Sequence, residues 1–117
     1  MNDAYERFQE GQLFLAAGDA PAAIDALERA RELEPEKASI RETLARAYFR
    51  ARRFLEAELE FSKAVDLDPV NDYAHFGIGL CAIRNGDPDR ARGHLKLATV
   101  MRPDSEDYRN ALARVTE

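Results

Sequence analysis

The sequence predicts an all-α protein, and three observations carry this prediction. Alanine, leucine, glutamate and arginine, which all favour helices, dominate the 117 residues, whereas valine occurs at only four positions. Within each segment the apolar residues recur every three or four positions, as they do along one face of a helix. Finally, the helix-ending residues Pro35, Pro69 and Pro103 lie 34 residues apart. We therefore expect helices stacked in a repeating order.

An internal repeat organises the whole chain. Ala30, Ala64 and Ala98 each stand five residues before one of these prolines. Three further columns keep the 34-residue spacing. They are a second alanine (Ala23, Ala57 and Ala91), a large apolar residue (Leu27, Phe61 and Leu95) and a later apolar residue (Leu33, Leu67 and Met101). These columns define units of about residues 4–37, 38–71 and 72–105, which we expect to form one domain of residues 1–117.

In the first and third units, turn residues divide the unit into two helices. Gly18 and Gly86 stop the first helix, and the aspartate after each glycine caps the second. Pro21 and Pro88 then fit into the first turn of that second helix, where a missing N–H costs little. Each proline of the 34-residue period ends the second helix of its unit.

The second unit lacks these turn residues. Arg52 and Arg53 stand where the other units have glycine and aspartate. We therefore expect the turn of the second unit to be stiffer or differently capped.

The last segment predicts one more helix, whose apolar Tyr108, Leu112 and Val115 cover the third unit. This interpretation makes residues 105–117 a C-terminal capping helix. The alternative is that they begin a further unit of a longer array. The helices predicted in total are at about 3–17, 20–33, 37–51, 54–67, 71–85, 88–101 and 105–116.

These columns resemble the tetratricopeptide repeat family, whose pattern runs W-x2-L-G-x2-Y, then A-x3-F, then P. The matching residues are Arg7, Glu10, Gly11, Phe14, Ala23, Leu27 and Pro35 in the first unit, Arg41, Leu44, Ala45, Tyr48, Ala57, Phe61 and Pro69 in the second, and His75, Ile78, Gly79, Ala82, Ala91, Leu95 and Pro103 in the third. The tryptophan column is absent and Glu10 replaces an apolar residue, so we expect the first helix to pack loosely. The resemblance implies a right-handed α-solenoid of three helix-turn-helix units plus the capping helix, seven helices in all.

Composition narrows the class of function and the location. The chain has 17 basic and 22 acidic side chains, and this net charge of −5 opposes a general nucleic-acid-binding role. No signal peptide is visible, and the longest apolar run, Leu13 to Ala17, is too short to span a membrane. The single cysteine, Cys81, forms no intrachain disulfide, so we expect a cytoplasmic protein. Arginine outnumbers lysine 14 to 3, which we take as a sign of a GC-rich bacterial genome.

No catalytic or metal-binding constellation is visible, so we expect neither an enzyme nor a cofactor. His75 and His94 are 19 residues apart without a third ligand, and we interpret His75 as a partly buried structural residue. Cys81 lies in an apolar helical run, which indicates a buried, unreactive thiol. Gly77 and Gly79 have no phosphate-loop continuation.

The resemblance also implies where a partner binds, because in this family the first helices of successive units line a concave groove. Aromatic side chains and arginine are enriched at binding hot spots, and arginine recognises carboxylates. Phe49 and Tyr73 can instead fill the core between units. The groove residues that the resemblance indicates are Tyr5, Phe8, Gln12, Arg46, Phe49, Arg50, Tyr73, Phe76, Leu80, Arg84 and Arg114.

Some family members hold the C-terminal carboxylates of heat-shock chaperones with a clamp of lysine, asparagine and arginine. The matching positions here are Phe8, Gln12, Thr43, Tyr73 and Gly77, of which only Gln12 is chemically close. We therefore do not expect that specific activity.

The leading hypothesis is an adaptor or scaffold that binds a protein or peptide segment of acidic and apolar character in this groove. The alternative is a structural module that forms homo-oligomers through its ends or by exchange of the last helix. Nucleic-acid contact through the arginines is a third hypothesis, which the net charge of −5 opposes.

Overall fold

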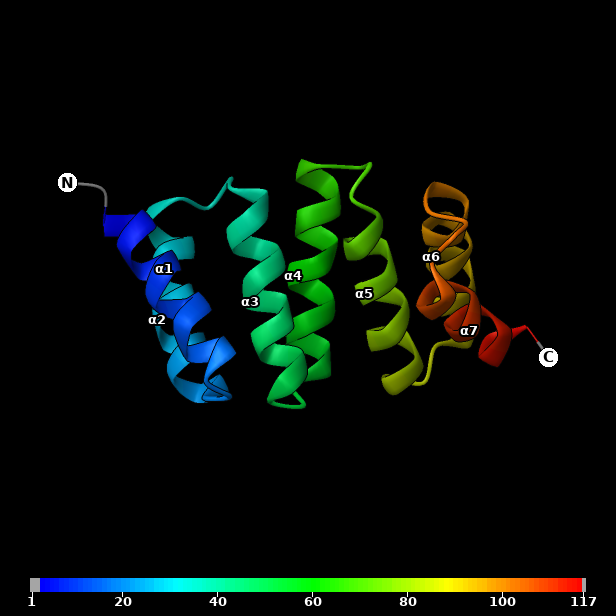
Figure 1. The fold of residues 1–117 in the computed structure, drawn as a ribbon, viewed down its shortest axis with the longest axis horizontal. Helices are drawn as coiled ribbons and strands as arrows, with labels where there is room; N and C mark the ends of the chain where they lie inside the picture. Colours follow the sequence, from blue (N-terminus) through cyan, green and yellow to red (C-terminus); the bar gives the residue numbers. More distant parts are fainter. Residues whose placement is uncertain (1–2, 117) are drawn as a thin grey trace.

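The computed structural model describes residues 3–116, which form seven α-helices and no strand (Figure 1). Each predicted helix is present, and its bounds lie within one residue of the prediction. The predictions for residues 1, 2 and 117 lie outside the described residues. The helices are α1 Asp3–Ala16, α2 Ala20–Leu33, α3 Ala38–Arg50, α4 Phe54–Leu67, α5 Asp72–Arg84, α6 Pro88–Met101 and α7 Glu106–Val115.

The helices stack in chain order into an elongated body of 49 × 24 × 22 Å. In each unit the two helices pack against each other, and the second helix also packs against the first helix of the next unit. Figure 1 shows the resulting row, with α1 and α2 at one end and α6 and α7 at the other. This is the predicted α-solenoid, in which each unit contacts only its neighbours.

The three turns inside the units have one backbone geometry. Gly18 and Gly86 have φ angles of 81° and 79°, and Arg52 has a φ of 63° at the equivalent position. In each turn two amide N–H groups donate to the last carbonyls of the preceding helix, as in a Schellman motif. Asp19 accepts a capping hydrogen bond in the first unit and Asp87 in the third, whereas Arg53 makes no side-chain cap. The prediction of a differently capped second turn is confirmed.

Small residues allow the paired helices to approach closely. A Cβ atom added to Gly11 would lie 2.4 Å from Cγ of Leu27, and one added to Gly79 would lie 2.5 Å from Cγ of Leu95. The expected loose packing of the first helix is therefore wrong. The substituted Glu10 is exposed and pairs with Arg7 Nε at 2.9 Å, so it does not disturb the contact.

At the positions that correspond to the family's tryptophan, Arg41, His75 and Arg109 donate hydrogen bonds to the carbonyl oxygen of the preceding proline of the 34-residue period. Arg41 Nε donates to the carbonyl oxygen of Pro35 at 3.0 Å, and Nη1 of Arg109 donates to that of Pro103 at 2.6 Å. His75 Nε2 lies 3.1 Å from the carbonyl oxygen of Pro69 and donates to it, because a carbonyl only accepts. This proline–carbonyl contact gives a hydrogen-bond donor to a carbonyl in the turn that follows the helix.

Two polar contacts, each with one buried member, occupy equivalent positions in the second and third units. Glu60 is buried and accepts hydrogen bonds from Arg31 at 2.6 Å and Arg41 at 3.0 Å, which joins α2, α3 and α4. One unit later, His75 and His94 bring their Nδ1 atoms to 3.0 Å and stack their rings. His75, which the sequence predicts to be partly buried, is buried and contacts His94 of α6.

The core is divided between two clusters of buried residues. One runs from Leu15 through Leu44 to Ile78, and the other joins Leu95 to Ala111 of α7. Cys81 is fully buried, and this burial raises the pKa of its thiol to about 12, so the thiol is protonated and unreactive as predicted.

Candidate binding groove

Three neighbouring hollows follow the first helices of the units. One of about 160 Å³ lies between α3 and α5, one of about 220 Å³ lies between α1 and α3, and one of about 200 Å³ lies at the first turns of α1 and α3. Arg46 and Arg50 line both the first and the second hollow, which makes the two continuous. We call the three hollows together the groove.

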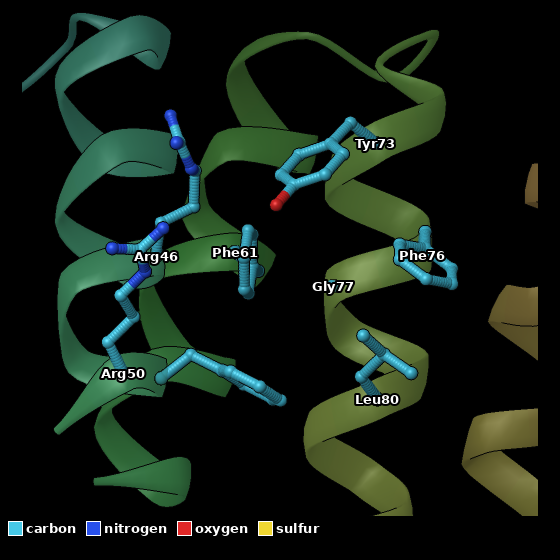
Figure 2. A pocket seen from close by; sticks show the side chains of 8 residues that line it. Arg46, Arg50, Phe61, Tyr73, Phe76, Gly77 and Leu80 are labelled. Atoms are coloured by element: carbon cyan, nitrogen blue, oxygen red, sulfur yellow. The ribbon is translucent and has the colours of Figure 1, made fainter. Parts of the chain in front are cut away.

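The hollow between α3 and α5, the anchor hollow, has an apolar floor. Gly77 has no side chain there, and a Cβ at this position would lie only 2.5 Å from the Phe61 ring. Phe61 therefore reaches the floor from α4 (Figure 2). The full lining of the anchor hollow is Arg46, Phe49, Arg50, Phe61, Tyr73, Phe76, Gly77 and Leu80.

Two arginines form the charged wall of the anchor hollow. Arg46 and Arg50 lie one turn apart on α3, opposite Phe76 and Leu80 on α5 (Figure 2). Nη1 of Arg50 donates to the carbonyl oxygen of Leu15 at 3.0 Å, which holds its guanidinium between α1 and α3. Within residues 3–116 neither arginine forms an ion pair with a carboxylate. Both can therefore receive an anionic group from outside.

Tyr73 closes the top of the anchor hollow. Its ring packs edge-on against Phe61 at a centroid distance of 6.1 Å and lies 6.2 Å from the Phe76 ring. Burial raises the pKa of the Tyr73 phenol, and the positive charge of Arg46 opposes this effect. The hydroxyl is thus a neutral hydrogen-bond donor at pH 7, and Figure 2 shows it directed between the two helices.

The last helix supports the wall that α5 provides. The Phe76 ring lies 4.6 Å from the Tyr108 ring of α7. The Tyr108 hydroxyl donates to Asp72 at 2.7 Å, and Arg102 Nε donates to the same carboxylate at 3.0 Å. These hydrogen bonds lower the pKa of Asp72, so its carboxylate stays charged and holds α7 against α5.

Nine of the eleven predicted groove residues line the three hollows. Arg46, Phe49, Arg50, Tyr73, Phe76 and Leu80 come together in the anchor hollow, Gln12 lines the second hollow, and Tyr5 and Phe8 line the third. Arg84 lies outside these hollows, with its guanidinium carbon 5.1 Å from the centroid of the Phe54 ring, and Arg114 is exposed on α7.

Sequence reasoning missed Phe61 and Gly77 as lining residues of the anchor hollow. Phe61 stands in a column of core residues, and its equivalents Leu27 and Leu95 are fully buried. The signal that could have indicated it is the pairing of the largest residue of that column with a glycine on the facing helix.

The arrangement suits the binding of a side chain and an anion together. An apolar side chain fits the floor, while a carboxylate can take two parallel hydrogen bonds from a guanidinium. Residues 3–116 contain no cluster of three or more side chains suited to a metal ion. In the same part of the chain, no helix has the length and apolarity needed to cross a membrane.

Comparison with known proteins identifies the architecture. The model of the tetratricopeptide repeat matches residues 8–72 and 42–108. A TPR repeat-containing protein of Pseudomonas aeruginosa is 35% identical over 112 residues, which cover 96% of this chain but only 41% of that protein.

Solved structures share the fold at low sequence identity. The first TPR of Spaghetti (RPAP3), bound to the HSP90 peptide SRMEEVD, superposes with a TM-score of 0.93 at 21% identity over 97% of this chain and 90% of that chain. The second TPR domain of human RPAP3, in complex with the HSP70 peptide SGPTIEEVD, gives 0.92 at 20% identity over 98% and 96%. The repeat columns, the stacked helical hairpins and the matching family model agree, and the chain belongs to the tetratricopeptide repeat family.

Proposed function

We propose that the groove binds a segment of a partner protein that carries an aromatic or leucine side chain and nearby Asp or Glu. The observation that carries this proposal is the juxtaposition of two guanidinium groups, Arg46 and Arg50, which have no carboxylate partner among residues 3–116, with the apolar floor made by Phe61 and Gly77. The apolar side chain supplies affinity by burial, and the carboxylate supplies orientation. Such a module is an adaptor without catalytic activity, and its single buried thiol suits the reducing cytoplasm.

Related structures support the class of ligand. The two RPAP3 domains are bound to acidic chaperone peptides, both of which end in the residues EEVD. Of the positions that match the chaperone clamp, only Gln12 is similar in this chain, so we propose a different acidic partner.

An array of short immobilised peptides tests the proposal, with aromatic or leucine residues and Asp or Glu varied independently. Peptides that combine both features should bind most tightly. Phe76→Ala and Arg46→Gln should each weaken that binding by about tenfold, because each removes one half of the recognition. Arg29→Gln removes an exposed arginine of α2, outside the groove, and is the matched control. Equal binding by all four proteins, or no binding at all, contradicts the proposal.

A second candidate is self-association through the first helix, and one observation favours it. Leu13 and Phe14 are 69% and 40% exposed on α1, whereas their equivalents Ala47 and Tyr48 are buried against the preceding unit. This exposed stripe could receive a second copy, which would make the apparent mass depend on concentration.

A further inference from the structure

The turn between α3 and α4 departs from two local rules that the corresponding turns of the first and third units obey. Its left-handed residue is Arg52 instead of glycine, and its N-cap is Arg53 instead of aspartate. A left-handed conformation strains any residue with a Cβ atom, and a missing cap leaves helix N–H groups without a partner. Rules of this kind are broken most often where a residue serves function instead of stability.

One arginine of this turn and one arginine at the end of α5 lie over the same aromatic ring. The guanidinium carbon of Arg52 lies 5.4 Å from the centroid of the Phe54 ring, and that of Arg84 lies 5.1 Å from it. Cation–π contacts at these distances hold both guanidinium groups in place while leaving their N–H donors exposed. We call Arg52, Arg84 and Phe54 the arginine corner.

The arginine corner adjoins the groove. The Phe54 ring packs edge-on against Phe49 at 5.1 Å, and Phe49 lines the anchor hollow. Phe49 therefore connects the anchor hollow with the arginine corner.

Nearby carboxylates do not neutralise the corner. Glu56 accepts from Arg53 Nε at 2.7 Å, and Glu58 accepts from Arg90 Nε at 2.6 Å and from Asn85 at 2.8 Å. Among residues 3–116, Arg52 and Arg84 form no ion pair. An acidic protein thus keeps two oriented guanidinium groups uncompensated beside its groove.

We propose that the arginine corner is a second subsite beside the anchor hollow. It binds carboxylates of the peptide segment at a fixed distance from the apolar side chain that occupies the hollow. This inference rests on the proposed function of the groove, and it specifies where the acidic residues of the partner lie. Arg52 is the specificity-determining residue of the subsite, and it takes the place of a glycine that would suit the turn better.

The experiment uses the whole chain and peptides that carry one Phe anchor and a Glu triplet placed at successive distances from it. Binding is measured by fluorescence anisotropy, with a Glu-free Phe peptide as reference. One placement of the triplet should bind about fivefold more tightly than the others, as expected for two exposed charge pairs. Arg52→Gly and Arg84→Gln should remove this preference and leave the affinity for the Glu-free peptide unchanged. High salt should reduce the preference in the wild type.

Arg52→Gly removes the guanidinium group without disturbing the turn, because glycine already makes the same turn at Gly18 and Gly86. The melting temperature of this variant should therefore match or exceed that of the wild type. Arg29→Gln is the control for an exposed arginine away from the corner. Two outcomes overturn the inference. One is a preference for one placement of the triplet that survives in both variants. The other is that a single-stranded RNA binds more tightly than the peptides and that both variants abolish this RNA binding. If instead no peptide binds, or Phe76→Ala has no effect, the proposed groove itself is wrong.

Discussion

Two glycines in helices predict opposite responses to the same substitution. Gly79→Ala should destabilise the protein by about 1–3 kcal/mol, since the added Cβ would overlap Leu95 across the α5–α6 contact. Gly93→Ala should stabilise it by about 0.5–1 kcal/mol, since nothing lies within 4 Å of that Cβ and alanine loses less backbone entropy within a helix. Urea unfolding of both variants checks this. Equal effects would mean that the small-residue column does not set the spacing of the helices.

At the contact between α5 and α6, His94 packs against His75. Burial lowers the pKa of His94, and its electrostatic interactions with Arg90 and His75 lower this pKa further, against the opposing effect of Glu58. The folded protein therefore binds a proton at His94 less readily than the unfolded chain, in which the pKa is about 6.5. The resulting stability is present above pH 6.5 and is lost as the pH falls through the lowered pKa.

His94→Ala isolates this effect, because alanine stands at the equivalent position of the first unit, Ala26. We expect the difference in unfolding free energy between wild type and His94→Ala to shrink as the pH falls from about 7.5 to about 5. Denaturant unfolding over this range measures it. A difference that is constant with pH would show that His94 does not titrate differently in the folded and unfolded states.

The helices could be predicted from the sequence because their signals are local. Turn glycines, capping aspartates and the 34-residue period mark each boundary, and even Arg52 makes the turn that its column requires. The prediction was weaker at helix ends, where the column residues Leu33 and Met101 are 54% and 40% exposed instead of buried. An apolar period does not reveal that no neighbour covers its last turn.

The site was predicted only in part, because it depends on contacts between units. Six of the groove residues that the family resemblance implies come together in the anchor hollow, three from α3 and three from α5. The role of Phe61, the contact between His75 and His94, and the position of Arg84 over Phe54 depend on side-chain packing between helices. Spacing along the chain contains no information on these contacts.

Because the core is divided into two clusters, we expect a substitution in one cluster to destabilise mainly the helices that surround that cluster. Leu44 and Leu95 are both fully buried, but they belong to different clusters. Replacing either with alanine should cost about 2–5 kcal/mol. Leu95→Ala should reduce amide protection in α6 and α7 while α1 and α2 stay protected, and Leu44→Ala should act on the first two units.

Hydrogen exchange followed by mass spectrometry measures this distribution directly. Gly93→Ala, which changes α6 without touching either cluster, serves as the control for a substitution in the third unit. A uniform loss of protection over all helices in both leucine variants would show that the two clusters unfold together.

The proline–carbonyl contact has a consequence for how the chain is made. Arg41, His75 and Arg109 each bind the carbonyl of a proline only six residues earlier. Closing so short a segment costs little entropy, and it needs no part of the chain that has still to be translated. As the chain leaves the ribosome, the hydrogen bond between each helical hairpin and the next helix can therefore form as soon as the first turn of that helix has formed. The array can grow from its N-terminus in order, without waiting for the last unit.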